Sequence, residues 1–251
     1  MEHADNQPDV AHVVLDRPDN RNAQTPATWR ALAAVGESLD ATVRVVVVTG
    51  AGQSFSAGLD RRMFTADGVP GEPGLAALAA LPPEELNAAI AEFQRGFSWL
   101  SDGPFVTVAA VQGHAVGAGF QLALACDLMV VADDAQLSMR ETSLGLVPDL
   151  TGTQRLVARV GESRALEICA SGRWVDAEEA VRLAIAVSVC ARDDLASTVD
   201  RTLAPILAAP PAAVVAIKGL LRGAGIRPAD EQRAAERAAQ VLRLKDLAGT
   251  T

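Results

Sequence analysis

The chain has 251 residues, with 31 acidic and 22 basic side chains and a formal net charge of −9 at pH 7. Hydrophobic residues make up 49% of it, enough to build a sizeable core in one large domain or in one domain with an appendage. The acidic balance argues against a general nucleic-acid binder, although it leaves room for a local basic site for a phosphorylated cofactor.

The cysteines and histidines do not form a recognisable metal or disulfide pattern. Cys126, Cys169 and Cys190 lack CxxC spacing, and the histidines, at positions 3, 12 and 114, do not cluster with them. We expect buried thiols in a reducing compartment and no metal or separate cofactor. The polar start, "MEHADNQPDV", has no signal-peptide core, and no apolar stretch reaches the length of a membrane span. These features predict a cytoplasmic protein without a membrane partner.

The first two thirds of the chain alternate strands and helices. Residues 10–17 read as a strand that stops before Pro18, and a helix follows with Thr25 as its N-cap and Pro26 at its first position. Apolar runs at 43–50, 103–113 and 127–133 are typical of strands buried on both faces. Residues 65–83 are rich in Gly, Pro and acid and predict a loop, and a helix follows at 83–102. The pattern favours an α/β fold.

After residue 189 the strand signals end. Residues 193–207, 211–221 and 228–244 have helical spacing. We therefore predict a mixed core over residues 1–192 and a helical C-terminal part over residues 193–251.

Two glycine-containing stretches follow predicted strands. "GAGQSFSAGLD", residues 50–60, leaves the second strand, and "GHAVGAGFQLALACD", residues 113–127, opens a helix. Exposed main-chain N–H groups from two such loops could converge on one oxygen, which is what an oxyanion hole requires. For the first stretch an ordinary turn remains the alternative. The Rossmann, Walker A and hydrolase-elbow patterns all fail here, and His114 reads as a local hydrogen-bonding residue.

Two acids in "MRETSLGLVPDLTGTQRL", residues 139–156, could move a proton. Glu141 lies beside Leu144, Leu146 and Val147, and apolar neighbours of this kind raise a carboxyl pKa toward neutrality. The alternative for Glu141 is a surface acid. For Asp149, eight residues on, the alternative is an N-cap for the helix through Gln154 and Arg155.

In order and spacing, these stretches together resemble the enoyl-CoA hydratase/isomerase (crotonase) family over about residues 10–221. The resemblance implies a spiral of ββα units, a helical C-terminal part used in assembly of a trimer or hexamer, and an unsaturated acyl-CoA of fatty acid metabolism as substrate. It also implies that the thioester oxygen accepts from the main-chain amides of Ala57 and Ala118. Further expected contacts to the substrate are Ser56, Gly58, Leu59, Asp60, Gly117 and, for a CoA phosphate, Lys218, for which a solvated surface lysine is the alternative.

The chain departs from the family's hydratases at one position. Those hydratases carry two glutamates, which align with Gln121 and Glu141. Gln121 can orient a water but cannot take its proton. Isomerases need one acid/base, and Glu141, with Asp149 as a possible second acid, fits that requirement. Double-bond isomerisation is therefore slightly favoured over hydration. The alternatives are an acyl-CoA-binding homologue with little catalysis and a trimeric scaffold with a degenerate site.

Overall fold

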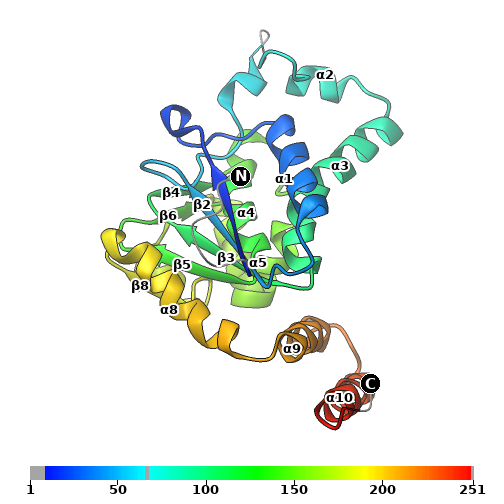
Figure 1. The fold of residues 1–251 in the computed structure, drawn as a ribbon. Coiled ribbons are helices and arrows are strands. Elements are labelled where there is room, and N and C mark those ends of the chain that lie inside the picture. The colour runs from blue at the N-terminus through cyan, green and yellow to red at the C-terminus, as the bar shows by residue number, and fades with distance from the viewer. Residues whose placement is uncertain (1–8, 66–67, 250–251) are drawn as a thin grey trace.

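The computed structural model describes residues 9–65 and 68–249, and its centre is a parallel sheet (Figure 1). The five strands lie in the order β1-β2-β3-β5-β8, and every neighbouring pair is parallel. They are β1 Val10–Leu15, β2 Val45–Gly50, β3 Val106–Val111, β5 Leu128–Ala132 and β8 Ser188–Cys190. The polar start of the chain, with His3, lies outside the described residues.

The run of valines in β2 is buried on both sides of this sheet, as its sequence predicted. Val46 and Val48 join the apolar cluster that includes helices α1 Pro26–Ser38 and α3 Pro83–Asp102. Val45 and Val47 join the cluster on the opposite face, against α8 Leu195–Ala208. Side chains alternate along a strand, so a central strand covered on both faces needs apolar residues at every position.

A second, three-stranded sheet stands beside the first. It consists of β4 His114–Val116, β6 Gln136–Ser138 and β7 Val175–Asp176, in the order β4-β6-β7. β4 occupies part of the stretch that the sequence presented as a glycine loop, and β6 pairs with it in parallel. This short strand carries the chain from the main sheet into helix α4.

The helices include those expected and several that were not. Besides α1, α3 and α8 they are α2 Leu75–Ala79, α4 Ala118–Ala125, α5 Gly152–Val160, α6 Glu162–Ser171, α7 Ala177–Arg182, α9 Pro211–Ala224 and α10 Ala229–Leu247. Short 3-10 helices span Pro18–Asn20, Arg61–Phe64, Glu141–Leu144 and Arg192–Asp194. The Thr25 side chain caps α1 through a capping box with Thr28, as predicted for its N-cap. Helix α2 lies inside the segment predicted as a loop, of which residues 66–67 lie outside the described part.

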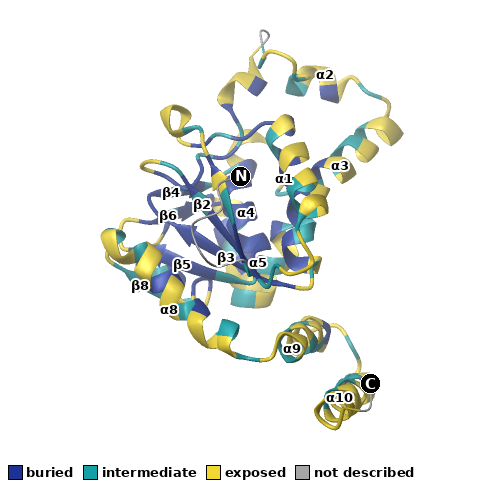
Figure 2. Ribbon diagram, in the orientation of Figure 1, coloured by how far each residue is buried: buried dark blue, intermediate teal, exposed yellow. Residues whose placement is uncertain are grey.

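Helices α9 and α10 form an arm, residues 211–247, that extends from the body (Figure 1). Much of its surface is exposed (Figure 2), including Leu221 at 67%, Ile226 at 75% and Leu247 at 85%. Helix α8, although it lies beyond residue 192, packs Val199 and Leu203 into the core. The division at residue 192 stays a prediction. Val214 at the start of α9 still packs against the core, and α10 has no buried residue.

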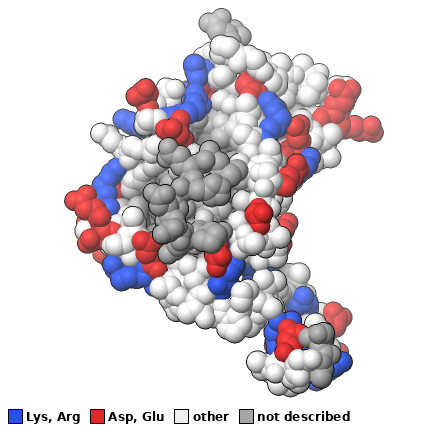
Figure 3. Space-filling view, viewed as in Figure 1, with Lys and Arg blue, Asp and Glu red and all other residues white. Residues whose placement is uncertain are grey.

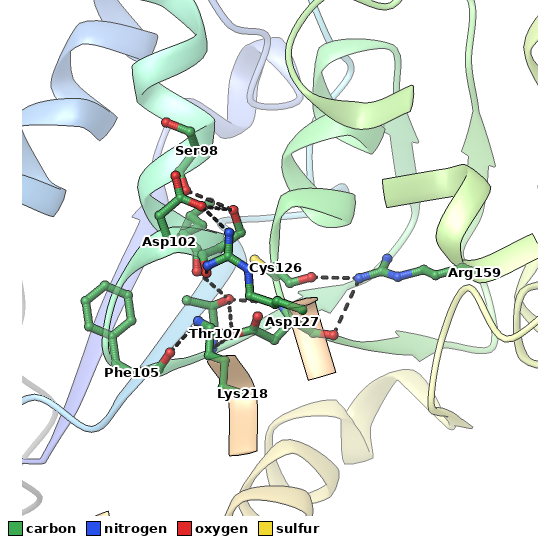
Figure 4. A network of polar contacts seen from close by, with 11 residues as sticks. Ser98, Asp102, Phe105, Thr107, Cys126, Asp127, Arg159 and Lys218 are labelled. Carbon is green, nitrogen blue, oxygen red and sulfur yellow. Dashed lines mark hydrogen bonds and ion pairs between the residues drawn. The ribbon is translucent and has the colours of Figure 1, made fainter. Parts of the chain in front are cut away.

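A polar network ties the arm to the body (Figure 4). The Lys218 ammonium of α9 pairs with Asp127 at 2.7 Å and donates to the Phe105 carbonyl oxygen at 2.6 Å. Asp127 also accepts from the amide and hydroxyl of Thr107, and Arg159 donates to the Cys126 carbonyl oxygen at 2.7 Å. Lys218 and Asp127 form an ion pair, and Arg159 is satisfied by carbonyl oxygens, so each partly buried charge has a polar partner.

Both signs of charge are distributed around the face seen in Figure 3. Within the described residues, no single helix is long and apolar enough to span a membrane. Only the bent pair of Arg192–Ala208 with Pro211–Ala224, at 106°, meets the length and composition of a span.

Candidate active site

Glu141 is a buried carboxylate at the start of the 3-10 helix that follows β6. The residue is 9% exposed, and its Oε1 accepts a hydrogen bond from Gln121 Nε2 at 2.7 Å. Its Oε2 is buried without a hydrogen-bond partner among the described residues. A buried carboxylate oxygen without a partner costs free energy, so it indicates a site that a substrate completes.

Gln121, on α4, is fully buried and its amide is held at both ends. Oε1 accepts from the backbone N–H of Leu150 at 2.8 Å and of Gly152 at 3.3 Å, while Nε2 donates to Glu141. The sequence suggested that Gln121 orients a water. In the structure its amide instead holds the carboxylate and the segment that precedes α5.

The pKa of Glu141 is raised, first because burial disfavours the charged form and further by the nearby charge of Asp149. The hydrogen bond from Gln121 acts in the opposite direction. A raised pKa was expected from Leu144, Leu146 and Val147. Those three residues are themselves 57%, 41% and 69% exposed, so they do not form a buried apolar pocket around Glu141. Gln121 of α4 and Gly117, the residue before α4, lie against the Glu141 carboxylate, where a Cβ on Gly117 would be 3.3 Å from Oε1.

Asp149 lies close enough to Glu141 for its charge to act there, and burial raises its own pKa. Its carbonyl oxygen accepts from Gln94 Nε2 of α3 at 2.7 Å. The alternative role as an N-cap is wrong, because α5 begins after Thr151 and no side chain caps it. The structure therefore brings Gln121, Glu141 and Asp149 to one place.

The two glycine stretches meet at Gly58 and Val116. Gly58 has φ +82°, and a Cβ there would lie 2.3 Å from the Val116 carbonyl oxygen and 3.6 Å from the Ala118 nitrogen. Only glycine allows this approach. It places the segment after Gly58 beside the first turn of α4.

The free amides of these stretches differ from those expected. The Ala57 N–H donates to the Arg21 carbonyl oxygen at 2.8 Å, so it is already engaged and does not fit an oxyanion hole. Neither the Leu59 N–H nor the Ala118 N–H has an acceptor within the described ranges. The flanking Gly58 carbonyl and Asp60 amide both bond to Gln24, so Leu59 N–H faces away from that pairing.

Two other expected substrate contacts have structural roles. Ser56 is fully buried, and its hydroxyl donates to the Asn22 carbonyl oxygen at 2.7 Å and accepts from Gln24 and from Gly58 N–H. The Asp60 carboxylate pairs with Arg17 and Arg62, and the side-chain hydrogen bond from Arg62 lowers its pKa to about 2. These side chains hold the loop together, and the substrate contacts expected at the two residues stay predictions.

Lys218 is not a candidate for a CoA phosphate. Its ammonium is engaged with Asp127 and Phe105, and its side chain is only 10% exposed (Figure 4). Burial lowers its pKa. Neither the expected phosphate contact nor the solvated surface lysine describes it, because it anchors the arm.

The remaining expected features are simple to place. Gly117 has φ +50° and its N–H donates to Ser138 O at 2.8 Å, which fixes the entry to α4 beside Glu141. His114 lies 3.4 Å from the Ser54 hydroxyl through Nδ1, as a local hydrogen-bonding role requires. No group of His, Cys, Asp and Glu suited to a metal occurs in the described part of the chain.

Sequence reasoning named Leu59 as a substrate contact but not as an amide donor, and it missed the amides of Leu150 and Gly152. The signal for Leu59 was its position directly after Gly58, but the choice between amides depends on φ at that glycine and on the Arg21 carbonyl. The N–H groups of Leu150 and Gly152 both point at Gln121 because Thr151 has φ +70°. A left-handed conformation is rare for threonine, so the sequence does not predict it.

Comparison with known proteins agrees with this architecture. The family model for enoyl-CoA hydratase/isomerase matches residues 5–244. A probable enoyl-CoA hydratase of Mycobacterium tuberculosis is 34% identical over 232 residues, 92% of this chain and 81% of that protein. A probable enoyl-CoA hydratase of Bacillus subtilis is 36% identical over 156 residues, 62% of this chain and 55% of its own length.

Solved structures of a Thermobifida fusca YX protein, provisionally named an enoyl-CoA hydratase, are 48% identical to this chain. One, in complex with acetoacetyl-CoA, has a TM-score of 0.91 and covers 95% of this chain and 92% of its own. Another, in complex with CoA, has a TM-score of 0.89 and covers 96% and 91%. The chain belongs to the enoyl-CoA hydratase/isomerase family and has the crotonase fold, as its sequence indicated.

Proposed function

We propose that this chain moves a proton on an unsaturated acyl-CoA thioester, with Glu141 as the acid/base and double-bond isomerisation favoured over hydration. The observation that supports it most is the buried, unpartnered Oε2 of Glu141. A carboxylate whose pKa is raised by burial is suited to take and return a proton near neutral pH. The CoA ligands named for the Thermobifida fusca structures support an acyl-CoA as the substrate class.

In this reaction Glu141 Oε2 removes a proton from C2 of a 3-enoyl thioester. The electron pair of that C–H bond moves onto the thioester oxygen and forms a dienolate. The same carboxyl group then returns the proton to C4, leaving the double bond between C2 and C3. The substrate and the product have the same composition, so the reaction consumes no water and needs no oxidant or reductant. One acid/base is enough.

We propose the main-chain amides of Leu59 and Ala118 as donors to the thioester oxygen, with Leu59 replacing Ala57. Both N–H groups lack an acceptor in the described ranges, and the Gly58–Val116 contact brings their segments together. Fixed donors of this kind stabilise developing oxyanion charge by about 3–4 kcal/mol each. Asp149 is proposed as a second carboxylate that tunes or shares the proton.

The arm supports a further proposal, assembly into a trimer or hexamer. Its exposed apolar residues make a surface that a single copy leaves open to water. We also expect the activity in the cytoplasm, in keeping with three free cysteines.

The test incubates the purified protein with 2-enoyl-CoA and 3-enoyl-CoA of several chain lengths. Isomerisation increases the absorbance of the conjugated thioester, whereas hydration decreases it. Glu141→Gln is expected to lower the isomerisation rate by about 10²- to 10⁴-fold while CoA binding stays nearly unchanged. Glu92→Gln, at an exposed position of α3, is the matched control and keeps the wild-type rate.

Each contrary result has a defined meaning. A full rate in Glu141→Gln removes Glu141 from the mechanism. Tight binding of both substrates without turnover supports the alternative, an acyl-CoA-binding homologue with little catalysis.

A further inference from the structure

The amide of Gln121 can adopt only one orientation in its surroundings. Two backbone N–H groups, from Leu150 and Gly152, point at its Oε1, and a carboxylate oxygen of Glu141 accepts from its Nε2 at 2.7 Å. Rotating the amide by half a turn would set NH₂ against two N–H donors and a carbonyl against a carboxylate. Such a change loses three hydrogen bonds in a fully buried place, where unmade bonds are costly.

The backbone that holds Gln121 is built for this contact. Thr151, between the two donating amides, has φ +70° and ψ 0°, a left-handed conformation that is strained for a β-branched residue. A left-handed residue between two amides makes a concavity of N–H groups that receives an oxygen. Helix α5 begins at Gly152, so the positive end of its dipole also faces Oε1. Strain of this kind persists where surrounding structure enforces it.

We propose that Gln121 is a positioning residue that reserves Oε1 of Glu141 and leaves Oε2 as the one oxygen that transfers protons. This inference rests on the proposed function of Glu141. It explains how the site keeps the Glu141 carboxylate in a single orientation. The side chain at position 121 cannot itself serve as a second base, because an amide in this place cannot accept a proton from water.

The hydrogen bond from Gln121 lowers the pKa of Glu141, whereas burial and the charge of Asp149 raise it. Asp149, on the segment before α5, acts on Glu141 with like charge, and Cys169 of α6 is near enough for Glu141 to raise the pKa of its thiol. The guanidinium of neighbouring Arg140 stacks on Trp174, 4.8 Å from its ring centre. Gln121 donates a hydrogen bond to the ionised form and holds the pKa of Glu141 below what burial alone would give.

The experiment measures the pH dependence of kcat for isomerisation in two variants at position 121. Gln121→Met keeps the volume but removes all three hydrogen bonds. We expect kcat to fall at least about tenfold and the acid limb of the profile to move up by about one pH unit, since the carboxylate loses a donor. Gln154→Met, at an exposed position of α5, is the control. It leaves the contacts of Glu141 and Asp149 in place, and its acid limb stays at the wild-type pH.

Gln121→Glu is the second variant and is nearly isosteric. One oxygen of the new carboxylate still accepts from the N–H groups of Leu150 and Gly152, and the other oxygen faces Glu141 Oε1. Two carboxylates so close share one proton and titrate in two macroscopic steps. We expect a second step in the pH profile and a gain of hydration on 2-enoyl-CoA. If Gln121→Met does not fold, as judged by circular dichroism, this variant still tests the inference.

The outcomes separate this inference from the proposed function. A wild-type pH profile and kcat in folded Gln121→Met, or a single unshifted step in Gln121→Glu, overturns the role of Gln121. If that result came together with a loss of activity in Glu141→Gln, the proposed function would stand and only the role of Gln121 would be overturned. An active Glu141→Gln variant overturns both.

Discussion

At the residue scale, Gly58 brings two separate segments into contact. Its α-carbon lies where a side chain would meet the Val116 carbonyl oxygen at 2.3 Å, and the amides of Leu59 and Ala118 flank this contact. A single added methyl group at this position pushes backbone against backbone, and neither side has a flexible end that could give way.

Gly58→Ala is therefore expected to lower kcat/KM by about 10²-fold, as loss of one oxyanion donor does, with a stability loss of roughly 1–3 kcal/mol. Gly71→Ala is the matched control, because Gly71 has φ +80° but nothing within 4 Å of an added Cβ. It incurs the backbone strain alone and keeps wild-type kcat/KM. Steady-state kinetics and urea unfolding measure both variants, and equal kinetic losses would contradict the role of the Val116 contact.

Residue types and spacing singled out Gln121, Glu141 and Asp149, because their side chains stand in a pattern that resembles a family. Their catalytic roles stay predictions. Amide donors are harder to predict, since every residue except proline carries one. Whether Ala57 or Leu59 faces the site depends on the Arg21 carbonyl, which lies 36 positions earlier than Ala57 and takes its hydrogen bond. The role of Lys218 was predicted wrongly for a similar reason, because the sequence does not show that its ammonium forms an ion pair with Asp127.

At the scale of elements, the start of α1 supports the segment that carries Gly58. Gln24 precedes the Thr25 cap, and its side chain accepts from Trp29 Nε1 at 2.8 Å and donates to Ser56 at 3.0 Å. Its backbone N–H also donates to the Gly58 carbonyl oxygen at 2.7 Å. The first turn of a helix thus fixes a loop of the candidate site.

Thr25→Ala is expected to lower the free energy of unfolding by about 1 kcal/mol, because it removes the capping box. Thr202→Ala is a suitable comparison, since its hydroxyl only donates back to Thr198 O within α8. That variant should change the free energy by less than about 0.5 kcal/mol. Urea titrations followed by circular dichroism measure both, and a loss in Thr25→Ala no larger than in Thr202→Ala would count against the cap.

Elements with strong local signals were predictable, and short ones were not. The Thr-Pro start of α1 and the valine run of β2 fix their structures through side-chain and backbone chemistry nearby. β4 has three residues between two glycines, and it becomes a strand because β6 pairs with it. Helix α2 has five residues, too few for helical periodicity to rise above the glycines and prolines around it.

At the scale of the whole molecule, the arm of α9 and α10 predicts assembly. Leu221→Glu places a charge on its exposed apolar surface, where burial against another copy would be costly. We expect wild-type masses of three or six chains by size-exclusion chromatography with light scattering, and mainly single chains for the variant. Ala88→Glu, at an exposed position of α3, is the control and keeps the wild-type mass. A wild-type chain that elutes alone would contradict the proposal.

The paired charges around Lys218 mean that the first helix of this arm has a fixed attachment before any second copy arrives. Under the proposed assembly, each new chain would present an exposed apolar surface whose position is already fixed. Association of several copies depends on their concentration to a power above one, so the amount of assembled protein should then increase more steeply than the amount of polypeptide made.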